Sequence, residues 1–129
     1  MLENSNETPY LGLPHIHAHQ GQKEVTANQF ADGLDTAIAG SIIIPLDQKI
    51  EYTLTTVEAR QAILIFTGVL TAPTTIIIPT ERANRKFIVM HHGSDNFPLL
   101  IRHLDTPSIT LQPNQRGWIV SDGTQLYLL

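Results

Sequence analysis

The sequence predicts a mainly β protein, a β-sandwich or jelly roll preceded by an extended N-terminal arm and one short α-helix. After residue 40, about eight or nine short apolar runs follow one another, and turn-forming residues separate them. No helix-length pattern lies between these runs, so a parallel sheet is not expected. We therefore expect two segments: an arm and helix over 1–40 for docking or oligomerisation, and a β-sandwich body over 41–129.

The arm, residues 1–25, is predicted to be irregular because Pro9, Gly12, Pro14 and Gly21 interrupt any regular pattern. It also carries apolar side chains, which would gain nothing from standing in water. We therefore expect the arm to lie against a surface. That surface is either a partner or the open edge of the chain's own sandwich.

A short helix is predicted over residues 26–39. Thr26 is a suitable N-cap, and Gln29 follows at the capping-box spacing. Gly33 weakens the helix by about 1 kcal/mol relative to Ala, and Gly40 is a plausible stop. One apolar stripe recurs every four residues: Phe30, Leu34 and Ile38.

The remaining chain alternates between apolar runs and turns. Residues 50–54 show the period-two pattern of a half-buried strand, whereas 62–66 indicates a strand buried on both faces. Asp122-Gly123 is the clearest hairpin turn. The predicted strands are 42–44, 50–54, 62–66, 75–78, 86–91, 99–104, 108–111, 117–121 and 125–129.

Composition excludes several function classes. Charged residues make up 16 %, against a usual share of about 25 %, which favours a chain that hides surface in an oligomer. The net charge is −4 and no run of Lys or Arg occurs, so nucleic acid is not an expected partner. No stretch approaches the roughly 20 apolar residues of a membrane span, and the polar, acidic N-terminus lacks the regions of a signal peptide.

Catalytic motifs are missing from the sequence. It has no cysteine, no Gly-x-Ser-x-Gly nucleophile motif and no phosphate-binding glycine loop. We therefore expect a non-enzymatic protein without a cofactor.

Six histidines are the remaining candidates for chemistry. His15, His17 and His19 alternate, so an extended backbone would present three imidazoles on one side, where they could bind Zn or Ni. The alternative is hydrogen bonding to a partner. His91 and His103 end two apolar strands, and a hairpin of those strands would place both near one end of the core, as satisfied core residues or as a two-histidine site.

Two aromatic residues fall on the predicted last hairpin. Trp118 and Tyr127 could form a platform that binds glycans. The alternative for Trp118 is burial in the core, because aromatic residues make up only 6 % of the chain.

Part of the N-terminal sequence resembles a known family. Leu11-Gly12-Leu13-Pro14 is followed by Gln20-Gly21-Gln22-Lys23-Glu24-Val25-Thr26-Ala27-Asn28 and then by Leu34-Asp35. This string resembles the N-terminal signature of an uncharacterised protein family of tailed phages, prophages and gene transfer agents. The second half, above all Trp118-Ile119-Val120-Ser121-Asp122-Gly123-Thr124, is similar to small β-domains of phage fibre and baseplate proteins, which commonly trimerise.

The resemblance implies a virion structural protein that assembles in the host cytoplasm with other virion proteins, as a homotrimer. Because only a short β-body follows the signature, we expect a tail-fibre or baseplate attachment or adaptor component rather than a receptor-binding fibre. The alternatives are a capsid decoration protein and a glycan-binding module. The residues expected to dock on a partner are Leu11, Leu13, Pro14, Ile16, Gln20, Gln22, Lys23, Thr26 and Asn28.

Overall fold

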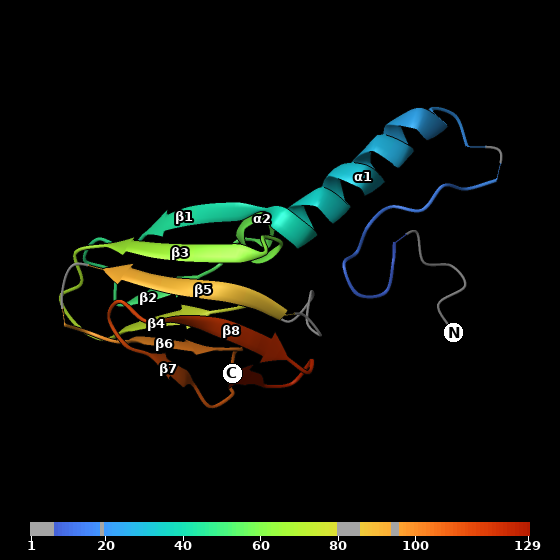
Figure 1. Cartoon of the computed structure of the whole chain (residues 1–129). Coiled ribbons are helices and arrows are strands. Elements are labelled where there is room, and N and C mark those ends of the chain that lie inside the picture. The colour runs from blue at the N-terminus through green and yellow to red at the C-terminus, as the bar shows by residue number, and fades with distance from the viewer. Residues whose placement is uncertain (1–6, 19, 80–85, 94–95) are drawn as a thin grey trace.

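The computed structural model describes residues 7–18, 20–79, 86–93 and 96–129. The fold is mixed α/β: a mixed five-stranded sheet, a mixed four-stranded sheet and one longer helix (Figure 1). It is not clearly the sandwich or jelly roll that the sequence predicts. The elements are α1 (Lys23–Ala39), β1 (Ser41–Pro45), β2 (Glu51–Thr53), α2 (Thr56–Ala59), β3 (Ile63–Gly68), β4 (Thr74–Ile77), β5 (Lys86–Gly93), β6 (Leu99–Arg102), β7 (Ile109–Leu111), β8 (Arg116–Ser121) and β9 (Leu126–Leu128).

From β1 to β6 the chain alternates between the two sheets; β7 then stays in the smaller sheet, and β8 and β9 both belong to the larger one. The larger sheet has the order β1-β3-β5-β8-β9 and the smaller one β2-β4-β6-β7. The pairs β1–β3, β3–β5, β2–β4 and β4–β6 are parallel, and the other three pairs are antiparallel. The expectation against parallel pairing was wrong because each crossover passes through a strand of the opposite sheet, and the only helix among their described residues is the four-residue α2, which lies between β2 and β3.

Both sheets contribute to one hydrophobic core. Leu64 and Phe66 of β3, Val89 of β5 and Ile76 and Ile101 from the smaller sheet are almost completely buried in the same cluster. Strand alternation sends every second side chain of each strand into this core. The described core residues of the cluster all lie between Ile44 and Leu126, so neither the arm nor α1 belongs to it.

Helix α1 begins earlier than the sequence predicts. Gln22, with a φ of 55°, precedes the first turn, and no side chain caps it. Thr26 is therefore not the N-cap: it lies within the helix, where its Oγ1 accepts a hydrogen bond from Gln20 Nε2. Lys23 and Glu24 are good helix formers, and an acidic side chain in the first turn is favourable. The predicted stop at Gly40 is confirmed.

A second, short helix escaped the sequence analysis although its signal is present. Thr55 caps α2, and Glu58 completes a capping box by accepting from the backbone N–H of Thr55 at 2.8 Å. The predicted hairpin between β8 and β9 is confirmed, with a left-handed Gly123 (φ 93°) in its turn.

Candidate functional site

The larger sheet has a second apolar face, turned away from the core. Leu64 of β3, Val89 of β5 and Ile119 of β8 point into the core. Because side chains alternate along a strand, the neighbours of each of these residues on its own strand point outward. The pairing of residues between neighbouring strands places these outward side chains next to one another, in rows across the sheet. We define the outer face as Ile43, Ile63, Ile65, Ile88, Met90, Trp118, Val120 and Tyr127.

This face is unusual for a solvated sheet surface. Ile43 is 63 % exposed and Trp118 is 48 % exposed, and the aliphatic residues between them are half-buried by one another. Parallel strands are normally covered on both faces, whereas a solvated face normally carries polar side chains. The basic residues Lys86 and Arg116 stand at the margins, opposite Val120 and Met90. An apolar, largely uncharged face of this size is typical of an interaction surface.

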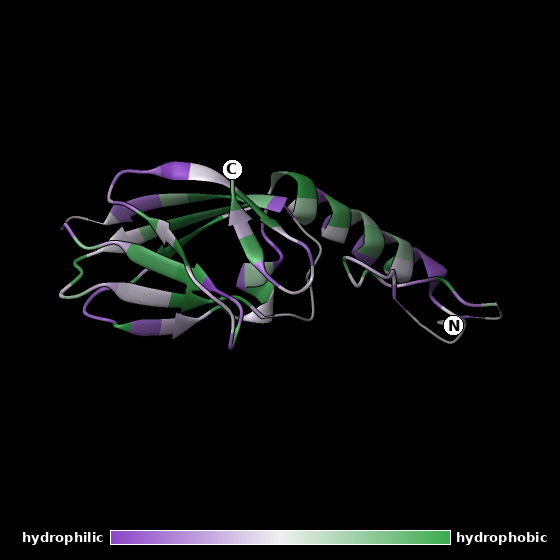
Figure 2. Cartoon of the chain, turned by 90° about the horizontal axis from the view of Figure 1, so that it is seen from below, coloured by the Kyte–Doolittle hydropathy of each residue, from purple (hydrophilic) through white to green (hydrophobic). Residues whose placement is uncertain are grey.

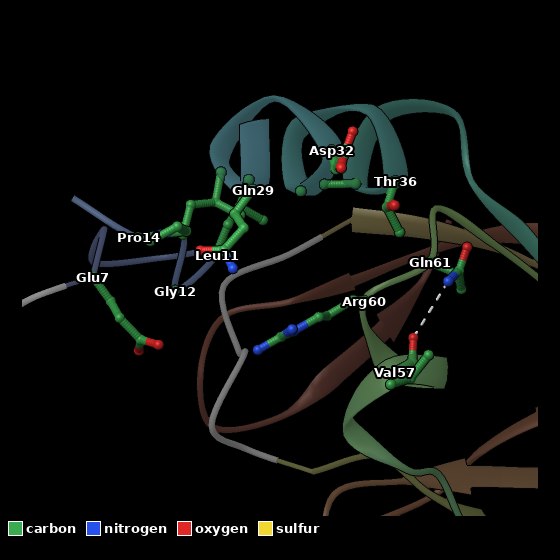
Figure 3. A pocket seen from close by; sticks show the side chains of 13 residues that line it. Glu7, Leu11, Gly12, Pro14, Gln29, Asp32, Thr36, Val57, Arg60 and Gln61 are labelled. Carbon is green, nitrogen blue, oxygen red and sulfur yellow. Dashed lines mark hydrogen bonds between the residues drawn. The ribbon is translucent and has the colours of Figure 1, made fainter. Parts of the chain in front are cut away.

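Helix α1 projects from the sheets, and the arm folds back alongside it (Figures 1 and 2). Leu13 is buried, and a Cβ at Gly33 would overlap its side chain. Gly33, which lowers the intrinsic stability of the helix, therefore makes room for Leu13 of the arm. A pocket of about 520 Å³ lies between the arm, this side of α1 and the α2 region (Figure 3). Gln29, Asp32, Thr36 and Arg60 are among its lining residues.

The opposite side of α1 carries an apolar seam, which consists of Ala27, Ala31, Leu34 and Ile38. Gln29, Gly33 and Thr36 on the arm side are each two positions from a seam residue, and two positions turn a helix by about 200°. Phe30 flanks the seam and is 37 % exposed, and Ile38 is 76 % exposed. A groove of about 390 Å³ joins the end of the seam to the outer face, and its apolar lining includes Leu11, Ile38, Ile63, Ile88 and Trp118.

The predicted docking residues divide into two groups. Leu13 packs on α1, and Gln20 and Thr26 bond to each other, so these three hold the arm in place. Leu11 and Pro14 are half-buried beside the same helix. The remaining residues are exposed and stand near the start of α1: Ile16, Gln22, Lys23 and Asn28.

Shortening Leu13 is expected to release the arm from α1. The Leu13→Ala variant removes buried apolar contact worth about 2 kcal/mol, which corresponds to roughly 30-fold faster local opening. Amide hydrogen exchange at Gly12 and Leu13, whose N–H groups bond to Thr8, measures this opening. Leu11→Ala, at a half-buried position, is the control and should have a smaller effect. Equal exchange rates in both variants would contradict the arm packing.

Of the N-terminal histidines, His15 and His17 lie in the described part of the arm. The backbone turns after His17, whose carbonyl accepts from the N–H of Gln20 while its own N–H donates to Gln20 Oε1 at 2.7 Å. His15 and His17 are exposed, and His19 lies outside the described residues. Within the described part of the chain, no group of three His, Asp or Glu side chains could hold a metal ion.

His91 and His103 are buried, but they do not share a hairpin, because β5 and β6 belong to different sheets. His103 Nδ1 lies 2.8 Å from the Ile78 carbonyl oxygen, so this nitrogen donates; Nε2 then accepts from Ser121 Oγ at 2.9 Å. His91 Nε2 likewise donates to the Phe97 carbonyl at 2.8 Å. Ser121, which sequence analysis did not single out, is 5 % exposed, so this Ser–His pair is a structural link between the sheets.

Trp118 and Tyr127 both lie on the outer face, each about half exposed, so Trp118 is not the core residue that its type suggests. The Tyr127 hydroxyl donates to Asp122 Oδ2 at 3.2 Å. Hydrogen bonds from the backbone N–H groups of Gln125 and Thr124, together with Tyr127, lower the pKa of Asp122. The negative charge of Asp122 in turn raises the pKa of Tyr127.

The Asp122→Asn variant is expected to lower the pKa of Tyr127 towards 10, as measured by NMR titration of the tyrosine rings. Tyr52 is the control: its pKa is raised mainly by its hydrogen bond to Glu58, so it should not change. Because folding lowers the pKa of Asp122, its stabilisation is complete above about pH 4 and disappears as pH falls through the folded pKa. An unchanged Tyr127 pKa in the variant would contradict the pairing.

Comparisons with protein-family models, with curated proteins and with solved structures found no match to this chain. Among the described residues, neither helix is long and apolar enough to cross a membrane.

Proposed function

We propose that this chain is a non-enzymatic structural module of a phage-like virion, where it serves as a tail-fibre or baseplate attachment component. The observation that carries the proposal is the projecting helix. Seventeen residues of α1 extend about 25 Å, and the helix begins at its end distant from the sheets (Figure 1). The arm packs on one side of this helix and stiffens it.

The far end of α1 presents side chains suited to a protein partner. Gln22, Lys23 and Asn28 offer directed hydrogen bonds, and Ile16 adds apolar area next to them. We define these four residues as the tip. Because Leu13, Gln20 and Thr26 hold the arm in its place, the tip needs little ordering when it binds, which lowers the entropic cost.

In this proposal the two sheets act as the layers of a β-sandwich body, which assembles as a homotrimer, and other virion proteins receive the tip. The likeness of residues 11–35 to the tailed-phage and gene-transfer-agent signature supports this setting. So does the low share of charged residues, 16 %, which suits a chain that covers much of its surface.

Immunogold labelling of purified particles from a host that encodes the chain tests the proposal. We expect label on tails or baseplates; label on capsids would assign the decoration role instead, and no particle-bound label would overturn a virion role. A tip variant (Gln22→Glu, Lys23→Glu, Asn28→Asp) should reduce the copies per particle. Acidic side chains near a helix start preserve α1, and Thr110→Glu, at an exposed site on β7, is the control.

A second candidate function, glycan binding, is favoured by one observation. Trp118 and Tyr127 are about half exposed on the same face, and aromatic side chains of this kind can form a platform for sugar rings. A glycan array probed with the intact protein and with Trp118→Ala tests it. Binding that the substitution abolishes would favour this candidate, and no binding would exclude it for the glycans on the array.

A further inference from the structure

We infer that the outer face and the seam of α1 form one continuous surface, and that further copies of this chain occupy it. The inference rests on the homo-oligomer of the proposed function and names the surface that builds it. Four observations support it: the continuity of the two apolar areas, the position of the arm, the distribution of charge and the available area.

The two apolar areas meet at the end of α1. Ile38, the last seam residue, lines the same groove as Ile63, Ile88 and Trp118 of the outer face. The groove is mainly apolar, and Lys86 supplies its one charged group among the described lining residues. A partner that covers the sheet face would therefore meet the helix without crossing a polar boundary.

The chain's own arm leaves most of this surface open, although Leu11 of the arm lines one part of the groove. It packs on the side of α1 that carries Gln29, Gly33 and Thr36, which are small or polar, and leaves the apolar seam uncovered. If the arm served to cover apolar surface within one chain, it would lie on the seam. Ala27, Ala31 and Ile38 of the seam are exposed although they are apolar, which indicates that another molecule packs there.

Charge favours another copy of the same chain on this surface. The chain has a net charge of −4, so copies repel one another unless their contact surface excludes acidic groups. The outward positions of β1, β3, β5, β8 and β9 carry no Asp or Glu in the described strands. The marginal charges, Lys86 and Arg116, are basic and attract the net negative charge of a neighbouring copy, whereas Glu24 and Asp35 of α1 lie beside the seam and do not.

The area is sufficient for a stable contact only when the two parts are combined. Five strands spaced by about 4.8 Å and about five residues long give a face of roughly 400 Å². One side of α1, about 25 Å long and 10 Å wide, adds roughly 250 Å². Side-chain relief raises the accessible area above this total, close to the roughly 800 Å² that one chain buries in a stable two-chain interface, and a trimer divides this area between two neighbours.

The seam also has the spacing of a self-associating helix. Its residues are four, three and four positions apart, which is the heptad pattern of helices that pack on copies of themselves. It covers less than two heptads, so helix pairing alone is too short to hold copies together. The outer face supplies the remaining contact, in a closed symmetric arrangement for which we expect a trimer.

Light scattering on the full chain and on Ile38→Glu tests this inference. We expect about 43 kDa for the full chain, which is three copies of 14.3 kDa, and 14.3 kDa for the variant. Trp118, the sole tryptophan, gives a second readout: its fluorescence should shift to longer wavelength when the variant exposes it. Because Ile38 lies outside the core, circular dichroism should show that the body of the variant remains folded.

Ile50→Glu is the matched control, because Ile50 is 66 % exposed but lies before β2, away from the outer face. It should leave both the mass and the fluorescence unchanged. A monomeric full chain, or an Ile38→Glu variant that keeps the mass and the emission of the full chain, would overturn the inference. Particle labelling tests the virion role and these masses test the interface, so either can fail without the other.

Discussion

Replacing Phe66 with Ala is expected to lower the free energy of unfolding by about 3–5 kcal/mol. Phe66 is 1 % exposed in the middle of β3, where Ile44 of β1 and His91 of β5 are its register neighbours. The substitution leaves a cavity in the core that both sheets share. Since domains are typically stable by about 5–15 kcal/mol, this is a large part of the total.

Urea denaturation at one fixed protein concentration measures this loss, because the stability of an oligomer depends on concentration. Ile50→Ala, at an exposed position outside the core, should change stability by less than about 0.5 kcal/mol. A Phe66→Ala variant as stable as this control would show that β3 does not lie in a core shared by the two sheets.

The His103→Leu variant is expected to lose about 2–4 kcal/mol although it keeps most of the side-chain volume. It leaves the Ile78 carbonyl and the Ser121 hydroxyl without their imidazole partner, and an unsatisfied buried group costs about 1–3 kcal/mol. The bond to Ser121, at the end of β8, joins the two sheets, and the bond to Ile78 joins the ends of β4 and β6 within the smaller sheet.

A double-mutant cycle with Ser121→Ala separates the two bonds of His103. Ser121→Ala should cost less than His103→Leu, and the double variant should cost less than the sum of the two single losses. Additive losses in urea denaturation would mean that the imidazole and the hydroxyl act independently, contrary to their 2.9 Å contact.

Apolar alternation predicted most strands at nearly the correct positions, because side-chain period is a local property. Pairing direction is not local. The run 62–66 forms a strand, as predicted, but it is not buried on both faces, because Ile63 and Ile65 are only half-buried. Its parallel neighbours β1 and β5 follow from crossovers through the opposite sheet. The sequence around this run carries no signal for that path. The Asp122-Gly123 hairpin could be predicted because its turn is built from adjacent residues.

The candidate site was predictable in part. The pattern of apolar residues in the arm indicated packing on a surface, and Leu13 does pack, although on α1 and not on a sheet edge. The start of α1 was placed at Thr26 because its capping signal is strong, whereas Gln22 begins the helix without a side-chain cap. The outer face was missed because exposure of Ile43 and Trp118 depends on which elements cover the sheet, and only the three-dimensional structure gives that.

We propose that copies assemble through the outer face and the seam, while the arm stabilises the projecting helix and leaves the tip free for a partner. The mass in solution of the full chain and of a version lacking residues 1–21 tests it most directly. The shorter version keeps α1, and no residue of the core cluster is lost. We predict that both are trimers. A trimeric full chain that becomes monomeric on truncation would show that the arm joins the subunits and would contradict the account.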